Sequence, residues 1–253
     1  MSFPQRTNQA ISDLTDDSGA SYALITGIIG DLALGHYCTS YSSDAPTSDC
    51  EAASGNGFEK LTTITGTLSV NYVNRLQHLR MFPVLHTIEG ELLIDSQQFG
   101  AFESVDGLTD LTSVGGLVIG SSKPLFTSLS GLQNLETCNG RFDLSGLAAV
   151  TDSTTLSSLE TIDGSFRVAD CFPALLSLSF IPTSVTISGT ISIYNNRNLC
   201  QYMVEDFCAG AGRSCSGGNF FFNKVCSRPT DSPAPAGSAP VTSTAYTGGL
   251  STP

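Results

Sequence analysis

The amino-acid sequence predicts an all-β fold, a right-handed parallel β-helix (solenoid) of about six to seven rungs. Three observations lead to this prediction: a repeat with a step of about 25 residues, apolar residues that recur at every third position, and a switch to alternation after a glycine. A fixed period of this length is typical of a solenoid, in which each repeat packs only on its neighbours. The glycines that mark the repeat are Gly30, Gly66, Gly90, Gly116, Gly140, Gly164 and Gly189.

Within one repeat the apolar spacing changes at the glycine. Leu156, Leu159 and Ile162 precede it at steps of three, which fits neither an α-helix nor a long strand. This spacing indicates a chain that bends repeatedly and points one residue inward at each bend. Phe166 and Val168 follow the glycine at a step of two, which is typical of a half-buried strand. We therefore expect each rung to contribute at least one strand to a parallel sheet that runs along the solenoid.

The rung glycines are interpreted as structural. A tight bend needs either a positive φ or room for the backbone of the neighbouring rung. A phosphate-binding glycine loop would instead precede a helix, and no helical pattern follows these glycines.

A hydroxyl residue precedes the buried aliphatic position in most rungs. Such a column can satisfy its own hydrogen bonds between rungs. Ice binding is a less favoured alternative, because it would need paired Thr-x-Thr steps on one flat face and this is a single column near a bend. The residues of the column are Thr63, Thr87, Ser113, Thr137, Thr161 and Thr186.

The first two rungs are separated by an insertion. Gly30 and Gly66 are 36 residues apart, and the surplus lies in residues 36–57, which are rich in Ser, Thr and Asp. This segment contains Cys38 and Cys50, so we expect a loop that is closed at its base by a disulfide. Loops on a rigid scaffold often carry function, which makes this segment a candidate for specific contacts.

Eight cysteines in a chain of this kind indicate an oxidising compartment. Four of them gather near the C-terminus, where a solenoid would otherwise expose its core. Four cysteines allow three pairings. We favour Cys200–Cys226 with Cys208–Cys215, because closing a cap onto the last strand needs the longer link.

The two remaining cysteines lie within the repeats. Cys138 occupies the buried aliphatic position of its rung and is expected to be a reduced, small apolar residue. Cys171 lies beyond the strand, at a different position in its rung from Cys138. A disulfide between Cys138 and Cys171 is therefore not the favoured interpretation. No C-x-x-C pair or histidine at ligand spacing accompanies the cysteines, and we expect neither a metal nor a cofactor.

The repeated phrase L-x-x-L-x-x-I-x-G-x-L-x-I resembles the receptor L domain, the β-helical ligand-binding module of insulin- and epidermal-growth-factor-type receptors. Related repeats occur in fungal cell-wall proteins and in bacterial and protist surface proteins. The stretch from Ile193 to Cys200 is similar to the N-x-x-L-C phrase that closes such domains. The resemblance covers about residues 22–226. Leucine-rich repeats share the first half of the phrase, but they carry an asparagine ladder that the sequence pattern does not show.

The resemblance implies a β-helix with a non-enzymatic, extracellular role. It also implies a capping helix at residues 201–207 and a final strand at 219–226. Ligand contacts in the receptors lie at variable outward positions, so no binding residue is transferred to this chain. The expected domain organisation begins with a polar arm at 1–20. A β-helix follows at 21–226 and includes the inserted loop 36–57 and the cap 200–226. The chain continues as a Pro/Ser/Thr-rich tail or linker at 227–253.

The net charge restricts the class of partner. The chain has 23 acidic and 11 basic residues, for a formal net charge of −12. This excess argues against nucleic acid and against anionic membrane surfaces. We expect protein partners, through self-association or contact with other surface proteins, and no membrane insertion.

The carboxylates do not form the pair that a polysaccharide-acting β-helix would need. Those expected to point outward are Asp31, Glu91, Asp143 and Asp163, and they fall on different rungs. No nucleophile-elbow phrase occurs either. The sequence therefore favours a non-catalytic, secreted or cell-surface protein that acts by surface contact.

Two roles of this kind remain open. The first is a structural or assembly subunit of a wall, sheath or filament, and the alternative is a ligand-binding or adhesion module of a receptor. The chain has no N-x-[ST] sequon, so no N-glycan is expected on a packing face, which favours the first.

Overall fold

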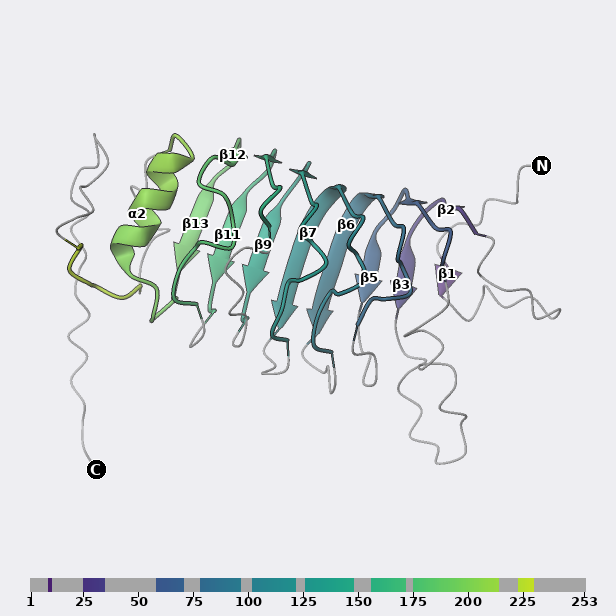
Figure 1. Cartoon of the computed structure of the whole chain (residues 1–253), viewed down its shortest axis with the longest axis horizontal. Coiled ribbons are helices and arrows are strands. Elements are labelled where there is room, and N and C mark those ends of the chain that lie inside the picture. The colour runs from purple at the N-terminus through teal and green to yellow at the C-terminus, as the bar shows by residue number, and fades with distance from the viewer. Residues whose placement is uncertain are drawn as a thin grey trace, which may run out of the picture.

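The computed structural model describes residues 9–10, 25–34, 58–70, 78–96, 102–121, 126–147, 156–171, 175–213 and 223–229. Over this part the chain forms a parallel β-solenoid, as the sequence predicts (Figure 1). Each rung supplies a short strand before the glycine and a longer one after it. The short strands are β2 (Gly27–Ile28), β4 (Thr63–Ile64), β8 (Thr137–Cys138), β10 (Thr161–Ile162) and β12 (Thr186–Ile187). The longer ones are β3 (Leu32–Leu34), β5 (Leu68–Val70), β9 (Phe142–Ser145), β11 (Phe166–Ala169) and β13 (Ile191–Tyr194), and in β6 (Thr87–Ser96) and β7 (Ser113–Ser121) the two segments are continuous.

The bends before the short strands explain the spacing of three. The N–H of Phe82 donates to the carbonyl of Leu79 at 3.1 Å, and the N–H of Leu85 donates to Phe82 at 3.4 Å. The next rung repeats this with Leu108 donating to Val105 at 3.2 Å. Each turn spans three residues, so every third side chain points into the core.

In the core, apolar side chains at the same position of successive rungs stack into columns. Phe142 and Phe166 occupy one such column and stack with ring centroids 5.3 Å apart. Each large apolar side chain buried in this way stabilises the fold by about 1.5–3 kcal/mol. The members of this column are Leu32, Leu68, Leu92, Leu117, Phe142, Phe166 and Ile191, and none is more than 7% exposed.

The rung glycines stack on one another and leave no room for a side chain. The N–H of Gly66 donates to the carbonyl of Gly30 at 3.0 Å, and the same bond joins later pairs of rungs. A Cβ at Gly164 would overlap the backbone of Gly140. Close approach of the backbone is therefore the reason for glycine at these positions.

One predicted member of this column is corrected. Gly115, rather than Gly116, faces the backbone of the preceding rung, because a Cβ at Gly115 would overlap the carbonyl of Glu89. The register between β6 and β7 shifts between Ile88 and Glu91, and this shift brings Gly115 into the column.

The C-terminal end of the coil is closed by helix α2 (Gln201–Gly210), which Figure 1 shows lying across the end of the sheet beyond β13. Val204, Phe207 and Cys208 are its buried residues. The ring of Phe207 lies 5.2 Å from that of Phe166, so the helix continues the core by one more layer.

The predicted bridge Cys200–Cys226 is present, with its Cα atoms 5.5 Å apart. Cys208 is also disulfide-bonded, and its predicted partner Cys215 lies outside the described residues. The predicted pair Cys38–Cys50 and the whole loop 36–57 lie outside them as well.

The N-terminal arm contributes one described element. Strand β1 (Gln9–Ala10) pairs in parallel with β3, with Gln9 opposite Leu32. Part of the predicted arm therefore extends the sheet by one strand. Among the described residues no helix has the length and hydrophobicity needed to cross a membrane.

Candidate functional site

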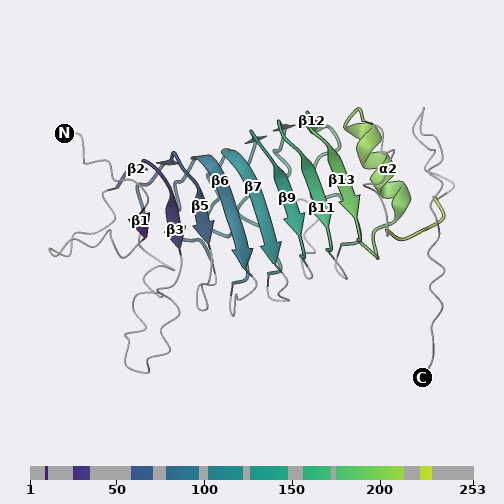
Figure 2. The ribbon, with the colours of Figure 1, turned by 180° about the vertical axis from the view of Figure 1, so that it is seen from behind.

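The candidate site is the outward face of the sheet formed by the longer strands, which lie side by side along the coil in Figure 2. Because side chains alternate along a strand, every second residue of these strands points away from the core. The central outward column runs through Ala33, Ser69, Leu93, Val118, Asp143, Arg167 and Ser192. It is apolar in its middle and charged towards the C-terminal end.

The apolar part of the face is centred on Leu93 and Val118, which are opposite each other in register and half-buried. Gly116 and Gly120 flank Val118 on its own strand at the next outward positions. Gly116 is buried, because the Glu91 side chain lies over it and would be 3.1 Å from a Cβ at that position. We call Leu93, Gly116, Val118 and Gly120 the face patch.

An ion pair spans this patch. Arg141 contacts Glu91 through Nε to Oε1 at 2.8 Å and Nη2 to Oε2 at 3.0 Å. The two residues belong to rungs that are not adjacent, and Gly116 occupies the same column between them. The hydrogen bond to Glu91 raises the pKa of Arg141. The missing side chain at Gly116 thus allows a charge pair to reach across one rung.

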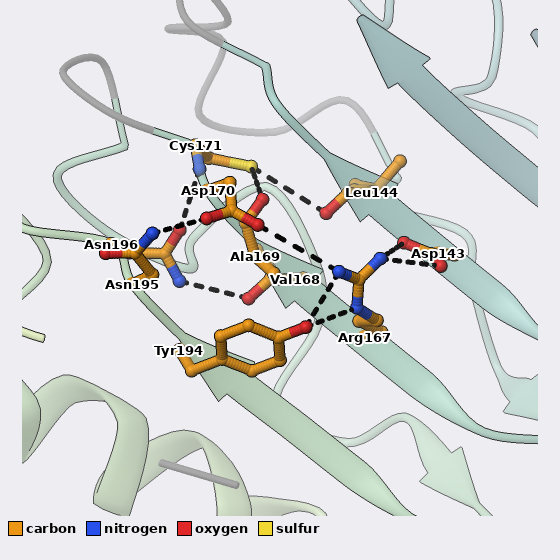
Figure 3. Close-up of polar contacts among 10 residues, drawn as sticks. All are labelled: Asp143, Leu144, Arg167, Val168, Ala169, Asp170, Cys171, Tyr194, Asn195 and Asn196. Carbon is orange, nitrogen blue, oxygen red and sulfur yellow. Dashed lines mark hydrogen bonds and ion pairs between the residues drawn. The ribbon is translucent and has the colours of Figure 1, made fainter. Parts of the chain in front are cut away.

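A second cluster ties the last rungs together around Arg167 (Figure 3). Its Nη1 donates to both carboxylate oxygens of Asp143 at 3.0 Å, and Nε and Nη2 donate to the hydroxyl of Tyr194 at 2.9 and 2.7 Å. Asp170 lies 3.9 Å from Nη2. Burial opposes the charge of Arg167, but the bonds to Tyr194 and Asp143 outweigh it and raise its pKa. Because Nε, Nη1 and Nη2 are all engaged, this guanidinium joins β9, β11 and β13.

Beyond the strands, two asparagines bridge successive rungs, Asn196 fully buried and Asn223 partly buried. The side chain of Asn196 accepts from the N–H of Cys171 and donates to the carbonyl of Val168, both at 3.0 Å. Asn223 repeats this one rung later, accepting from the N–H of Asn196 at 3.1 Å and donating to Ile193 at 3.0 Å. The structure therefore contains a short asparagine ladder, which corrects the prediction from the sequence pattern that no such ladder is present.

Cys171 occupies the same position one rung before Asn196. Its Sγ lies 3.7 Å from the carbonyl of Leu144, the counterpart of the carbonyl to which Asn196 donates. The 25-residue spacing of Cys171 and Asn196, close to the repeat itself, is the sequence signal that could have revealed the ladder. The thiol is thus a structural group at the corner of the coil.

The chain enters this ladder through bends of left-handed backbone. Asp170 has a φ of 58° and Asn195 a φ of 56°, and Gly146 has a φ of 67° at the same position one rung earlier. Asp and Asn are the non-glycine residues that tolerate this conformation best. The side-chain amide of Asn195 donates to the carboxylate of Asp170, which links the two bends.

Cys138 and Cys171 are free and buried. Burial raises the pKa of the Cys171 thiol to about 12 from its ordinary value of 9.0, and it raises the pKa of Cys138 as well. A thiol whose pKa is raised by folding favours the folded state fully at pH values below the pKa that it has in the unfolded chain. This contribution is lost as the pH rises through the pKa that the thiol has in the folded protein.

The free energy of unfolding is therefore expected to fall between about pH 9 and 12. Both thiols should resist a thiol reagent in the native protein and react after denaturation. Urea denaturation of the wild type and of the Cys171→Ala variant, repeated across this pH range, measures the alkaline loss of stability. An identical alkaline loss of stability in that variant would contradict the assignment.

The four carboxylates that the sequence predicts to point outward each have a separate environment. Asp31 accepts from the N–H of Thr67 at 2.7 Å, and Asp163 lies 3.4 Å from the hydroxyl of Ser188. Glu91 and Asp143 are paired with arginines as described above. The part of the chain that the structure describes holds no group of three or more His, Cys, Asp or Glu side chains arranged to bind a metal ion.

No protein-family model, curated protein or solved structure matches this chain. The resemblance to receptor L domains remains a prediction from the repeat phrase. The assignment of the fold as a β-solenoid follows from the parallel pairing and register of its strands.

Proposed function

We propose that the chain is a non-catalytic, secreted or cell-surface protein that acts by surface contact, as a structural or assembly subunit of a wall, sheath or filament. The outward face of the sheet carries this proposal. It presents the apolar side chains of Leu93 and Val118 beside two charge pairs, Glu91–Arg141 and Asp143–Arg167.

Paired charges lower the free-energy cost of covering this face. A lone charge loses its hydration when a partner buries it, whereas Glu91–Arg141 and Asp143–Arg167 keep their mutual hydrogen bonds. Covering Leu93 and Val118 then contributes at roughly 25 cal/mol per Å² of apolar surface. A face of this kind suits contact with a neighbouring protein, including a second copy.

The cysteines support the extracellular assignment. A disulfide at Cys200–Cys226 and a bonded Cys208 are typical of an oxidising compartment. The free thiols of Cys138 and Cys171 are buried, which protects them from exchange with these bridges.

The alternative is a ligand-binding or adhesion module of a cell-surface receptor. The phrase L-x-x-L-x-x-I-x-G-x-L-x-I, which resembles receptor L domains, favours it. Its ligand contacts would lie on outward positions of the same sheet.

The Val118→Glu variant tests the proposal, because it places an unpaired carboxylate in the centre of the face patch. Negative-stain imaging and size-exclusion chromatography of the full chain should show assemblies for the wild type and their loss in the variant. Thr127→Glu, at an exposed bend outside the sheet face, is the matched control and should assemble normally. Normal assembly of Val118→Glu would refute the role of the face, and a wild-type monomer that captures one soluble ligand would favour the receptor-like alternative.

A further inference from the structure

The charges on the sheet face change character at strand β7, which lies between β6 and β9 in Figure 2. Strand β6 contains three acidic residues and no basic one, whereas β7 contains no charged residue. Arg141 and Arg167 lie beyond β7 on the next two rungs, together with Asp143. The segments that follow these strands change this little, since residues 97–101 are uncharged and residues 148–155 add one aspartate. An uncharged strand therefore separates an acidic strand from a part of the face that contains arginines.

The ion pair Glu91–Arg141 lies at the centre of this pattern. Its two residues share one outward column, one rung before and one rung after Gly116. The side chain of Arg141 is 50% exposed and that of Glu91 is 34% exposed, so solvent reaches both. Glu91 accepts from Nε and Nη2 of Arg141, and Nη1 forms no hydrogen bond with the described residues. The pair therefore retains a donor with which it can bind a second carboxylate.

A second copy of the chain offers that carboxylate at the matching place. A two-fold axis that runs parallel to β7, between two facing sheets, sets β7 against β7 and reverses the order of the other strands. Strand β6 of each copy then faces residues 141–145 of the other, which brings Glu91 of one copy opposite Arg141 of the second. Symmetry repeats the contact, so the two ion pairs join into a ring of four alternating charges.

The other outward side chains fit the same orientation. Val118 lies on the axis and meets Val118 of the second copy. Leu93 meets Asp143, which accepts two hydrogen bonds from Arg167 at 3.0 Å and is only 18% exposed, so covering it leaves no unpaired carboxylate. A two-fold axis along the coil would instead set the acidic strand β6 against its own copy, which is repulsive. The charges therefore select coils that run in opposite directions.

We propose that the sheet face binds a second copy of this chain, with the two coils antiparallel and β7 at the two-fold axis. This inference rests on the proposed assembly role of the face and deepens it by naming the partner and its orientation. The longer strands, about 4.8 Å apart, give a face roughly 30 Å long and a few outward residues wide. Such a face is smaller than the about 800 Å² per partner of stable complexes, so the dimer is reversible and forms as the concentration rises.

Sedimentation equilibrium of the full chain over a concentration series measures the dimer. The mass should rise from 26.5 kDa towards twice that value. Arg141→Glu should weaken the dimer about tenfold or more, because it sets four carboxylates together, and adding Glu91→Arg should restore it with the signs reversed. The matched control is Arg80→Glu, which breaks the exposed pair with Asp106 at a bend outside the face and should dimerise normally. A monomeric wild type at the highest concentration, or an unchanged dimer in Arg141→Glu, overturns the proposal.

Oxidative cross-linking tests the orientation. Val118→Cys should form a disulfide-linked dimer, because the axis passes between the two copies of this residue. Leu93→Cys should not, because its two copies lie on opposite sides of the axis, roughly 10 Å apart along the coil. Cross-linking of both variants would show parallel coils and overturn this proposal while leaving the role of the face intact.

The Val118→Glu variant separates the failure of this inference from the failure of the proposed function. If Val118→Glu loses assembly but Val118→Cys forms no cross-link, the face is used by a different partner, and only the second-copy proposal is overturned. If Val118→Glu assembles like the wild type, the role of the face itself fails, and the dimer fails with it.

Discussion

Replacing Ile162 with aspartate is expected to unfold the coil. Ile162 is fully buried and stacks in register between Cys138 and Ile187. An aspartate there would place a carboxylate in the apolar column with no described cation beside it, at a cost of several kcal/mol. Because a domain is stable by only about 5–15 kcal/mol, this change removes most or all of its stability. Circular dichroism melts should show loss of the cooperative transition.

The control for this substitution comes from the same rung. Ser165 is exposed and points away from the core, so Ser165→Asp should melt within a few degrees of the wild type. The conservative Ile162→Val should cost about 0.5–1.5 kcal/mol. An unchanged melting temperature in Ile162→Asp would contradict the strand register.

The second large effect is expected for Asn196→Leu, which removes the first member of the asparagine ladder. The substitution leaves the N–H of Cys171 and the carbonyl of Val168 without the side-chain partner that each now has. A buried polar group left unsatisfied costs about 1–3 kcal/mol, so the two together predict a loss of about 2–6 kcal/mol. Urea denaturation measures the loss, and hydrogen exchange should show faster exchange of the Cys171 amide.

Asn139→Leu provides the comparison at an exposed asparagine on the outward face of the coil. It should change the free energy of unfolding by less than about 0.5 kcal/mol. Equal stability of Asn196→Leu and wild type would show that the ladder contributes nothing to the cap. Accelerated exchange at Cys171 without a global loss would place its effect in the last rungs alone.

The fold and most of its register could be predicted because a solenoid is a local, repeated pattern. Each rung packs only on its neighbours, so a residue such as Phe166 has the same surroundings as Phe142 one period earlier. The bridge Cys200–Cys226 follows from the same logic, since a coil end exposes its core and needs a closing link. The sequence by itself therefore determined the β-solenoid, its inward columns and its C-terminal cap.

Only the tertiary structure decided the features that depend on a shift or a long reach. Gly115 and Gly116 are adjacent and fit the period equally well, and the register shift between β6 and β7 selects the first. The pair Glu91–Arg141 spans two rungs, which a nearest-neighbour pattern does not encode. These features depend on how the backbones of separate rungs are offset in space, and a one-dimensional period carries no information about that offset.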